Sequence, residues 1–131
     1  MNFKIDTREK FTIITPVLDS FSDNLTADFS SIAHSYLENK INLVLNLKNV
    51  LSINEQAIQQ IAAFQQQFYE ENLSFVLCEL QPRVEAMVEQ LELDDVMNIT
   101  PSETEAWDIV QMEEIERELL DDEESPEEHE H

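Results

Sequence analysis

The spacing of hydrophobic residues along the chain predicts alternating strands and helices. Short apolar runs predict five strands, and apolar residues three or four positions apart predict four helices. The predicted strands lie within residues 3–5, 11–14, 41–47, 73–78 and 96–99. The predicted helices begin near Ser22, Ala57, Pro82 and Thr100, and the first of them ends near Asn39. Strands that alternate with helices in this way are typical of an α/β domain.

Two of the predicted strands are almost continuously apolar. The run Leu43-Val44-Leu45, with Leu47 beyond it, favours a central strand that is covered on both faces, and a buried helix is the alternative. Residues 73–78 form a second such run, so the two strands and the helix between them predict a right-handed parallel crossover. Cys78, the single cysteine, ends this run. It therefore cannot form an internal disulfide, and we expect a buried structural thiol.

Local signals mark several helix starts and turns. Pro82 suits the first turn of a helix, where its missing N–H costs nothing. Thr100-Pro101-Ser102-Glu103 predicts another start, with Thr100 as the cap and Glu103 as the residue that bonds back to it. The chain contains no glycine, so we expect turns with positive φ to use Asn or Asp. The candidates are Asn39, Asn49 and Asn72.

The length of 131 residues and the apolar fraction of 42% fit one folded domain with its own core. We expect this domain to cover residues 1–118 and an acidic, disordered tail to cover residues 119–131. No window is apolar enough for a membrane span, and the start of the sequence lacks a secretory apolar region. The sequence therefore predicts a cytoplasmic protein without direct membrane insertion.

The formal net charge is −22, from 29 acidic and seven basic residues. Residues 113–131 hold 11 acids and Arg117, which gives −10 and leaves −12 for residues 1–112, so the body of the domain is acidic as well. Nucleic acids and anionic membranes require clusters of Lys and Arg, and the charge argues against both. We expect a protein partner, and a monomer or weak dimer.

The sequence gives little support for catalysis. His34 occupies a polar helix position, and the other two histidines, His129 and His131, lie in the expected tail. None is near a plausible nucleophile, and the absence of glycine excludes a Gly-rich phosphate loop. No Cys/His spacing or calcium-loop pattern predicts a metal site. We therefore expect a non-enzymatic protein with no catalytic residue, no cofactor and no bound metal.

Two helix faces are candidate docking surfaces. The cluster of Trp107, Met112 and Ile115 either binds a partner or packs against the sheet, and the second reading is favoured. The helix after Asn54 has an uncharged polar face that either docks a partner or is simply solvated. That face consists of Gln56, Gln59, Gln60, Gln65, Gln66 and Gln67.

Five residue strings, taken in order, point to a known family. They are residues 14–19 (Ile-Thr-Pro-Val-Leu-Asp), 43–47 (Leu-Val-Leu-Asn-Leu), 51–58 (Leu-Ser-Ile-Asn-Glu-Gln-Ala-Ile), 75–84 and 91–99. In this order and spacing, residues 3–112 resemble the STAS domain, the family of bacterial anti-sigma factor antagonists. Residues 51–58 fall on the family signature hydrophobic-Asp-Ser-Ser-Gly-Leu. The resemblance implies about five strands in a mixed sheet, with about four helices packed mainly on one face.

In that family, a partner kinase that is also an anti-sigma factor phosphorylates the first serine of the signature, which dissolves their complex. Position by position, Asn54 takes the place of the aspartate, Glu55 of that serine, Gln56 of the second serine and Ala57 of the glycine. Ser52 lies three residues earlier and would not present the same geometry to a kinase. The resemblance therefore implies a partner switch that is lost or fixed in one state.

The presence of Glu55 in place of the serine has an electrostatic effect that does not depend on the resemblance. Asn54 is a good N-cap and places Glu55 in the first turn, where a carboxylate gains roughly 0.3–1 kcal/mol from the helix dipole. Phosphoserine suits the same place, and it carries almost two charges and three oxygens against one charge and two oxygens for Glu55. Glu55 is thus a partial mimic of the modified state, and an ordinary first-turn glutamate is the alternative.

These observations predict one partner-binding surface. Its residues are Asp19, Ser52, Asn54, Glu55, Gln56, Ala57, Gln59 and Gln60. The resemblance suggests an anti-sigma factor kinase as the partner. Because STAS domains also serve lipid-exporting ABC systems and anion transporters, a transporter subunit is the first alternative. An acidic decoy that acts by charge alone is the second.

Overall fold

A five-stranded mixed sheet forms the centre of the domain in the computed structural model, which describes the backbone of residues 2–127 and the side chains of residues 2–120. The strands, in the order β1-β2-β4-β6-β7, are β1 (Phe3–Thr7), β2 (Phe11–Pro16), β4 (Asn42–Asn46), β6 (Phe75–Cys78) and β7 (Ile99–Thr100). β1 is antiparallel to β2, and every other neighbouring pair is parallel. β4 therefore lies at the centre, as its apolar run predicts.

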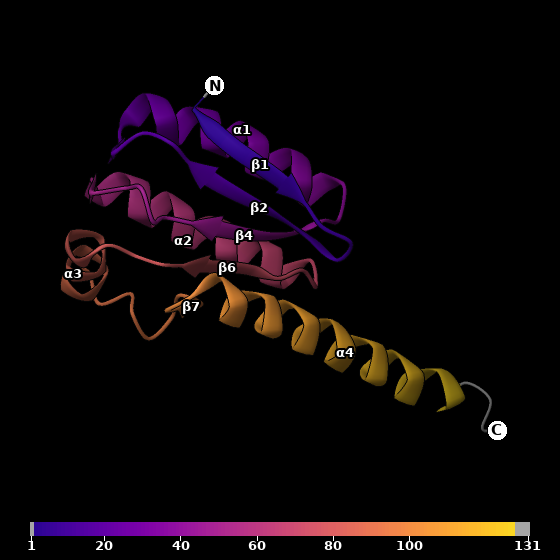
Figure 1. Cartoon of the computed structure of the whole chain (residues 1–131). Helices are drawn as coiled ribbons and strands as arrows, with labels where there is room; N and C mark the ends of the chain where they lie inside the picture. Colours follow the sequence, from indigo (N-terminus) through magenta and orange to yellow (C-terminus); the bar gives the residue numbers. More distant parts are fainter. Residues whose placement is uncertain (1, 128–131) are drawn as a thin grey trace.

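Within the described residues, four helices pack on this sheet (Figure 1). They are α1 (Asp23–Glu38), α2 (Glu55–Glu70), α3 (Pro82–Gln90) and α4 (Glu103–Glu127). α1, α2 and α3 contribute to the larger core on one face, whereas α4 covers the opposite face. The predicted α/β architecture, with its helices mainly on one face, is confirmed.

The side chains of β4 show how the sheet serves two cores. Leu43 and Leu45 belong to the larger core with α1 and α2, while Val44 between them belongs to the smaller core with Ala106 and Val110 of α4. All three β4 side chains are fully buried. Successive side chains of a strand point to opposite faces, so a strand covered on both sides must be apolar throughout.

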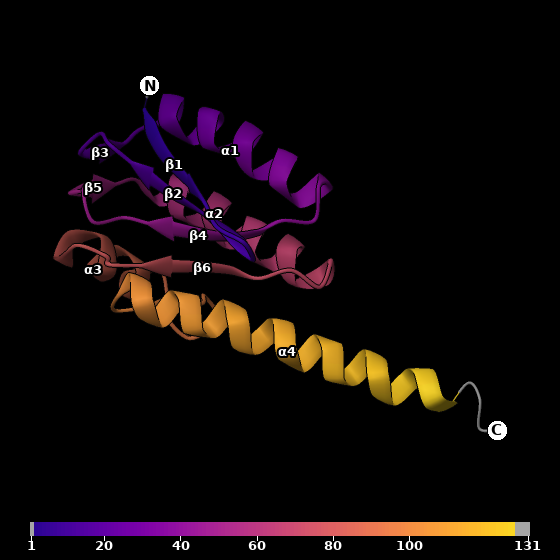
Figure 2. The same cartoon turned by 45° about the vertical axis from the view of Figure 1, so that its right-hand side comes forward.

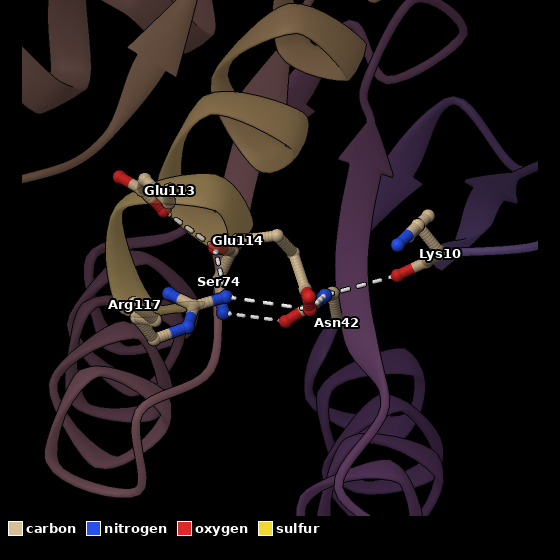
Figure 3. Close-up of polar contacts among 6 residues, drawn as sticks. All are labelled: Lys10, Asn42, Ser74, Glu113, Glu114 and Arg117. Atoms are coloured by element: carbon tan, nitrogen blue, oxygen red, sulfur yellow. Dashed lines mark hydrogen bonds and ion pairs between the residues drawn. The ribbon is translucent and has the colours of Figure 1, made fainter. Parts of the chain in front are cut away.

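Polar side chains fix α4 to the amino-terminal ends of β4 and β6 (Figure 3). The amide Nδ2 of Asn42 donates to the backbone oxygen of Lys10 at 2.9 Å and to Oε2 of Glu114 at 2.6 Å. Its Oδ1 accepts from the backbone N–H of Ser74 at 2.8 Å, and the Ser74 hydroxyl donates to Glu113. Asn42 and Ser74 are buried. Since buried polar groups require partners, this network sets the register of α4 on the sheet.

The start of α4 differs from the prediction. Thr100 is part of β7, which covers residues 99–100 rather than 96–99. Ser102 caps the helix instead, because its hydroxyl oxygen accepts from the Glu105 N–H at 3.2 Å and its hydroxyl lies 2.9 Å from Oε1 of Glu105. The predicted cap at Thr100 is wrong, since pairing of Cys78 with Thr100 draws this residue into the sheet.

Within residues 2–127, four residues with positive φ take the place of glycine in the turns. They are Lys40, Asn72, Glu79 and Glu92, so only Asn72 was among the predicted candidates. Glu79 has φ of 57° directly after β6, and its carboxylate accepts a hydrogen bond from the Glu103 N–H at 3.1 Å. A non-glycine residue in this conformation costs energy, and the contact with the amino terminus of α4 offsets part of that cost.

The described backbone is helical as far as Glu127. It therefore differs over residues 119–127 from the expected disordered tail, whose last residues, 128–131, lie outside the described part. The preceding turns of α4 are already held on the sheet, so the helix extends into this segment without a new nucleation step. The domain boundary at residue 118 stays a prediction.

Candidate functional site

The predicted surface begins where two short strands join distant segments. β3 (Ser20–Phe21) and β5 (Ser52–Ile53) pair in parallel as a small second sheet that the hydrophobic pattern did not predict. Just before them, the backbone oxygen of Asp19 accepts hydrogen bonds from Leu51 N–H at 2.7 Å and Ser52 N–H at 3.1 Å. Asp19 and the start of β5 therefore lie side by side.

Asn54 begins helix α2, as the sequence predicts. Its Oδ1 accepts from the Ala57 N–H at 2.7 Å, and its backbone is extended, with φ −91° and ψ 167°. Its Nδ2 donates to Oδ1 of Asp23, the first residue of α1, at 3.0 Å. Ser22 caps α1 in the same way, accepting from Leu25 N–H at 3.3 Å. The amino-terminal ends of the two helices are thus linked.

Glu55 is the first residue of α2 and is exposed to solvent. Within the described part of the chain, no basic side chain forms an ion pair with it. The helix terminus supplies unpaired backbone N–H groups and a positive end of the dipole at this position. The carboxylate is therefore both favoured here and available to a partner. Ser52, which does carry a hydroxyl, is half-buried within β5.

An open groove of about 560 Å³ lies between the amino-terminal halves of α1 and α2. Its lining consists of Asp23, Thr26, Ala27, Ser30, Gln56, Gln59 and Gln60. Among the described residues that line it, Asp23 alone is charged. The three glutamines are exposed and offer hydrogen-bond donors and acceptors without the charge that dominates this protein. The groove therefore joins the predicted turn to the first turns of α2.

Ala57 does not belong to the accessible surface. Its side chain is fully buried and packs in the larger core. The reason is its place in α2, where it shares the buried face with Ile58, Ile61 and Phe64. Its predicted role as a partner-binding side chain is therefore wrong, and its backbone N–H is already bonded to Asn54.

Three exposed apolar side chains border the site and were not predicted. Val17 and Leu18 precede Asp19, and Leu51 precedes Ser52, with exposed fractions of 49%, 42% and 52%. Asp19 and Leu51 are joined by a backbone hydrogen bond, so these residues lie near one another. Exposed apolar residues beside polar groups are typical of protein interfaces. Val17, Leu18 and Leu51 lie outside every predicted strand and helix, and this position was the sequence signal that could have indicated their exposure.

The glutamine face of α2 is not one surface. Gln65 turns toward the sheet edge, where its Nε2 donates to the backbone oxygens of Phe75 at 3.0 Å and Asn98 at 3.1 Å. Its Oε1 accepts from the Asn98 N–H at 3.1 Å. Gln65 therefore joins β6 to the segment before β7, whereas the exposed Gln66 next to it donates to Glu70 within α2.

Cys78 is fully buried in the smaller core, as expected. Burial raises the pKa of its thiol to about 12, and the nearby carboxylates of Glu79 and Glu103 add to this shift. A neutral, inaccessible thiol is a poor nucleophile and a poor metal ligand. Among the described residues, no group of three or more His, Cys, Asp and Glu side chains is arranged to hold a metal ion. Likewise, no described helix is long and apolar enough to cross a membrane.

The sequence model of the STAS domain matches residues 2–106. The chain belongs to the STAS domain family. Structures of other STAS proteins share its fold. A protein from Thermotoga maritima, assigned as an anti-sigma factor antagonist, superposes with a TM-score of 0.74 at 20% identity, covering 83% of this chain and 94% of its own. A serine-to-glutamate variant of RsbS from Moorella thermoacetica gives 0.68 at 15% identity, covering 85% and 96%.

This STAS domain also superposes on SLC26A9 with a TM-score of 0.62 at 14% identity, covering 83% of this chain and 21% of the other. All three likenesses lie below 25% identity and therefore establish the fold alone. None of the curated proteins matches the sequence. The STAS fold places the turn after β5 at the amino terminus of α2.

Proposed function

We propose that this STAS domain acts by binding another protein, in the manner of an anti-sigma factor antagonist, and catalyses no reaction. The binding surface consists of Asp19, Ser52, Asn54, Glu55, the groove glutamines and the bordering residues Val17, Leu18 and Leu51. The observation that carries the proposal is the exposed, unpaired Glu55 at the capped start of α2, where the family carries its phosphorylated serine.

The surface has the composition that a protein interface requires. Exposed Val17, Leu18 and Leu51 supply apolar contact area on one side of Asp19. The groove between α1 and α2 supplies uncharged hydrogen-bonding groups. A patch with both kinds of group matches the anatomy of non-obligate interfaces, in which an apolar centre is bordered by polar residues.

Glu55 fixes the charge state of this surface. A carboxylate at the first turn carries a permanent negative charge, whereas a serine there would carry none until phosphorylated. We propose that Glu55 holds the domain in one of the two states of the family switch. The affinity for the partner should then not depend on phosphorylation of this domain. The protein should act as a constant component of its regulatory pathway in the cytoplasm.

A transporter subunit is the second candidate partner. The similarity to SLC26A9, of which this fold matches about a fifth, favours this reading because a STAS domain there is one part of a transporter. The same surface would serve in either case. Binding to an anti-sigma factor kinase would support the first proposal, and binding to a transporter subunit would support the second.

The test compares Glu55→Ser and Glu55→Gln with the unmodified protein against the purified anti-sigma factor kinases of the same genome. Single substitutions keep Asn54 and therefore the α2 cap. Glu9→Gln is the matched control, because Glu9 is an exposed acid in the turn between β1 and β2. Isothermal titration calorimetry should show that Glu55→Gln changes the affinity for one kinase about tenfold. Glu9→Gln should leave that affinity unchanged.

With ATP present, the kinase should phosphorylate Glu55→Ser and none of the other three proteins. Deletion of residues 121–131 and measurement at about 0.5 M salt should leave binding largely intact, because a surface of mixed composition depends little on long-range charge. Loss of all binding on deletion would instead identify a charge-only decoy. If no kinase binds any of the variants, the anti-sigma reading fails and transporter subunits become the partners to test.

A further inference from the structure

Helix α4 carries an apolar stripe that faces solvent. Met112, Ile115 and Leu119 are exposed by 58%, 56% and 56%. Their spacing of three and four residues places them on one side of the helix, one above the other. We call these three residues the α4 stripe. Trp107, which the sequence grouped with Met112 and Ile115, is separate from it and packs on Phe11 with ring centroids 5.7 Å apart.

The α4 stripe cannot turn toward the sheet, because the opposite side of the helix is already fixed there. Ala106 and Val110 are fully buried in the smaller core. One turn later, Glu113 and Glu114 bond Ser74 and Asn42 at the strand ends, as Figure 3 shows. The carboxyl-terminal part of α4 then extends beyond the sheet in both views of the molecule (Figure 2). The stripe therefore remains unpartnered within the described chain.

The charges around the α4 stripe have one sign. Asp108 lies four residues before Met112, and Glu116 and Glu118 lie between Ile115 and Leu119 in sequence. Residues 113–131 carry a formal charge of −10. Arg117 is the single basic residue of α4, and it lies on the sheet side, 3.5 Å from Glu114 and 3.3 Å from the Ser74 hydroxyl. An apolar stripe between acidic flanks is complementary to a helix with an apolar stripe between basic flanks.

We propose that the α4 stripe binds a basic amphipathic helix of another protein. Apolar side chains of that helix pack against Met112, Ile115 and Leu119, and its Lys and Arg side chains face the acids that flank the stripe. A second copy of this chain fits less well, because it would bring two acidic helices together without counter-charges. This surface is distinct from the turn after β5, and the proposal does not depend on the function assigned to that turn.

The probe is a fluorescein-labelled synthetic peptide of about 20 residues that places Leu at helical spacing and Lys elsewhere. A peptide of identical composition with the Leu positions scrambled has the same charge and no stripe. The test variant is Met112→Ser, Ile115→Ser and Leu119→Ser combined in the full chain. The control variant is Tyr69→Ser with Val96→Ser, which removes two exposed apolar side chains elsewhere, at 75% and 72% exposure.

Fluorescence anisotropy at about 0.15 M salt should show at least about tenfold weaker binding of the peptide to the stripe variant, and binding within about twofold for the control. The scrambled peptide should bind about tenfold more weakly than the amphipathic one. Urea denaturation confirms that both variants fold. Equal affinities for the two peptides, or for the stripe variant and the unmodified protein, would overturn the proposal. A dimer by sedimentation that the stripe variant abolishes would also overturn it, in favour of a second copy.

Discussion

The amide of Asn54 donates a hydrogen bond to the carboxylate of Asp23, with 3.0 Å between Nδ2 and Oδ1. Because Asn54 also caps α2 through its Oδ1, one side chain both starts that helix and ties it to the first turn of α1. Together, the two bonds fix the orientation of the Asn54 side chain. The position of Glu55, which follows directly, is therefore set by contacts from two helices.

Replacement of Asn54 by alanine should remove both bonds. We expect a loss of about 1–2 kcal/mol in the free energy of unfolding, the usual effect of deleting an N-cap, measured by urea denaturation with circular dichroism. Asn54→Ser keeps a capping oxygen and should lose much less. Asn54→Asp keeps the cap but sets a second carboxylate against Asp23, so its deficit should shrink as salt is added. Equal stability of the alanine and serine variants would contradict the capping role.

Gln65→Ala should loosen the edge of the sheet. The amide of Gln65 makes three hydrogen bonds to the backbone of Phe75 and Asn98, and its loss leaves partly buried groups without partners. The expected cost is about 1–3 kcal/mol, together with faster hydrogen exchange of the Asn98 amide. Gln66→Ala on the same helix is the matched control and should change stability by no more than about 0.5 kcal/mol. Similar effects of the two substitutions would rule out the bridging role.

Asn42→Ala should release the middle of α4 from the strands. The substitution leaves the buried Ser74 N–H and the Lys10 carbonyl without their partner, which is expected to cost about 2–4 kcal/mol. Amide exchange around Glu113 and Glu114 should accelerate more than exchange in α1. Asn24→Ala, at an exposed position of α1, is the control. Unchanged protection of α4 in the Asn42 variant would show that its apolar contacts alone hold the helix.

Cys78 should make the protein less stable in alkaline solution. Burial raises the pKa of the folded thiol to about 12, whereas the unfolded thiol titrates near 9.0. Below that lower value both states keep the proton; above it the unfolded chain releases its proton first and is favoured. The contribution of Cys78 to stability is therefore lost as the pH rises from the lower pKa through the higher one, with a slope of at most about 1.4 kcal/mol per pH unit.

The measurement compares the unmodified protein with Cys78→Ala by urea denaturation at several pH values above neutrality. Other alkaline groups titrate equally in both proteins, so the difference between their unfolding free energies isolates the thiol. This difference should decrease as the pH rises above the unfolded pKa. A difference that is constant with pH would mean that the folded thiol titrates normally. In addition, a thiol reagent should label the native protein only as fast as it unfolds.

Local sequence determined the elements and most of their ends. Asn54 and Ser22 cap their helices through backbone groups three residues away, and Pro82 begins α3 by its fixed φ. The apolar run of β4 likewise determined its central place. These features depend on neighbours in sequence or on a pattern within one element, so the residues themselves carry the information. The predicted turn was therefore found at the start of α2.

Tertiary structure decided what these local signals cannot contain. The two-residue strands β3 and β5 form only because each supplies the other's hydrogen bonds, and their pairing brings Asp19 beside Leu51 and Ser52. The burial of Ala57 and the inward bonds of Gln65 depend on the sheet beneath α2. Likewise, the buried hydrogen bonds of Asn42 and Ser74 determine which side of α4 faces the sheet. Contacts between distant residues have no signature in the local sequence, and for that reason the accessible surface emerged only with the fold.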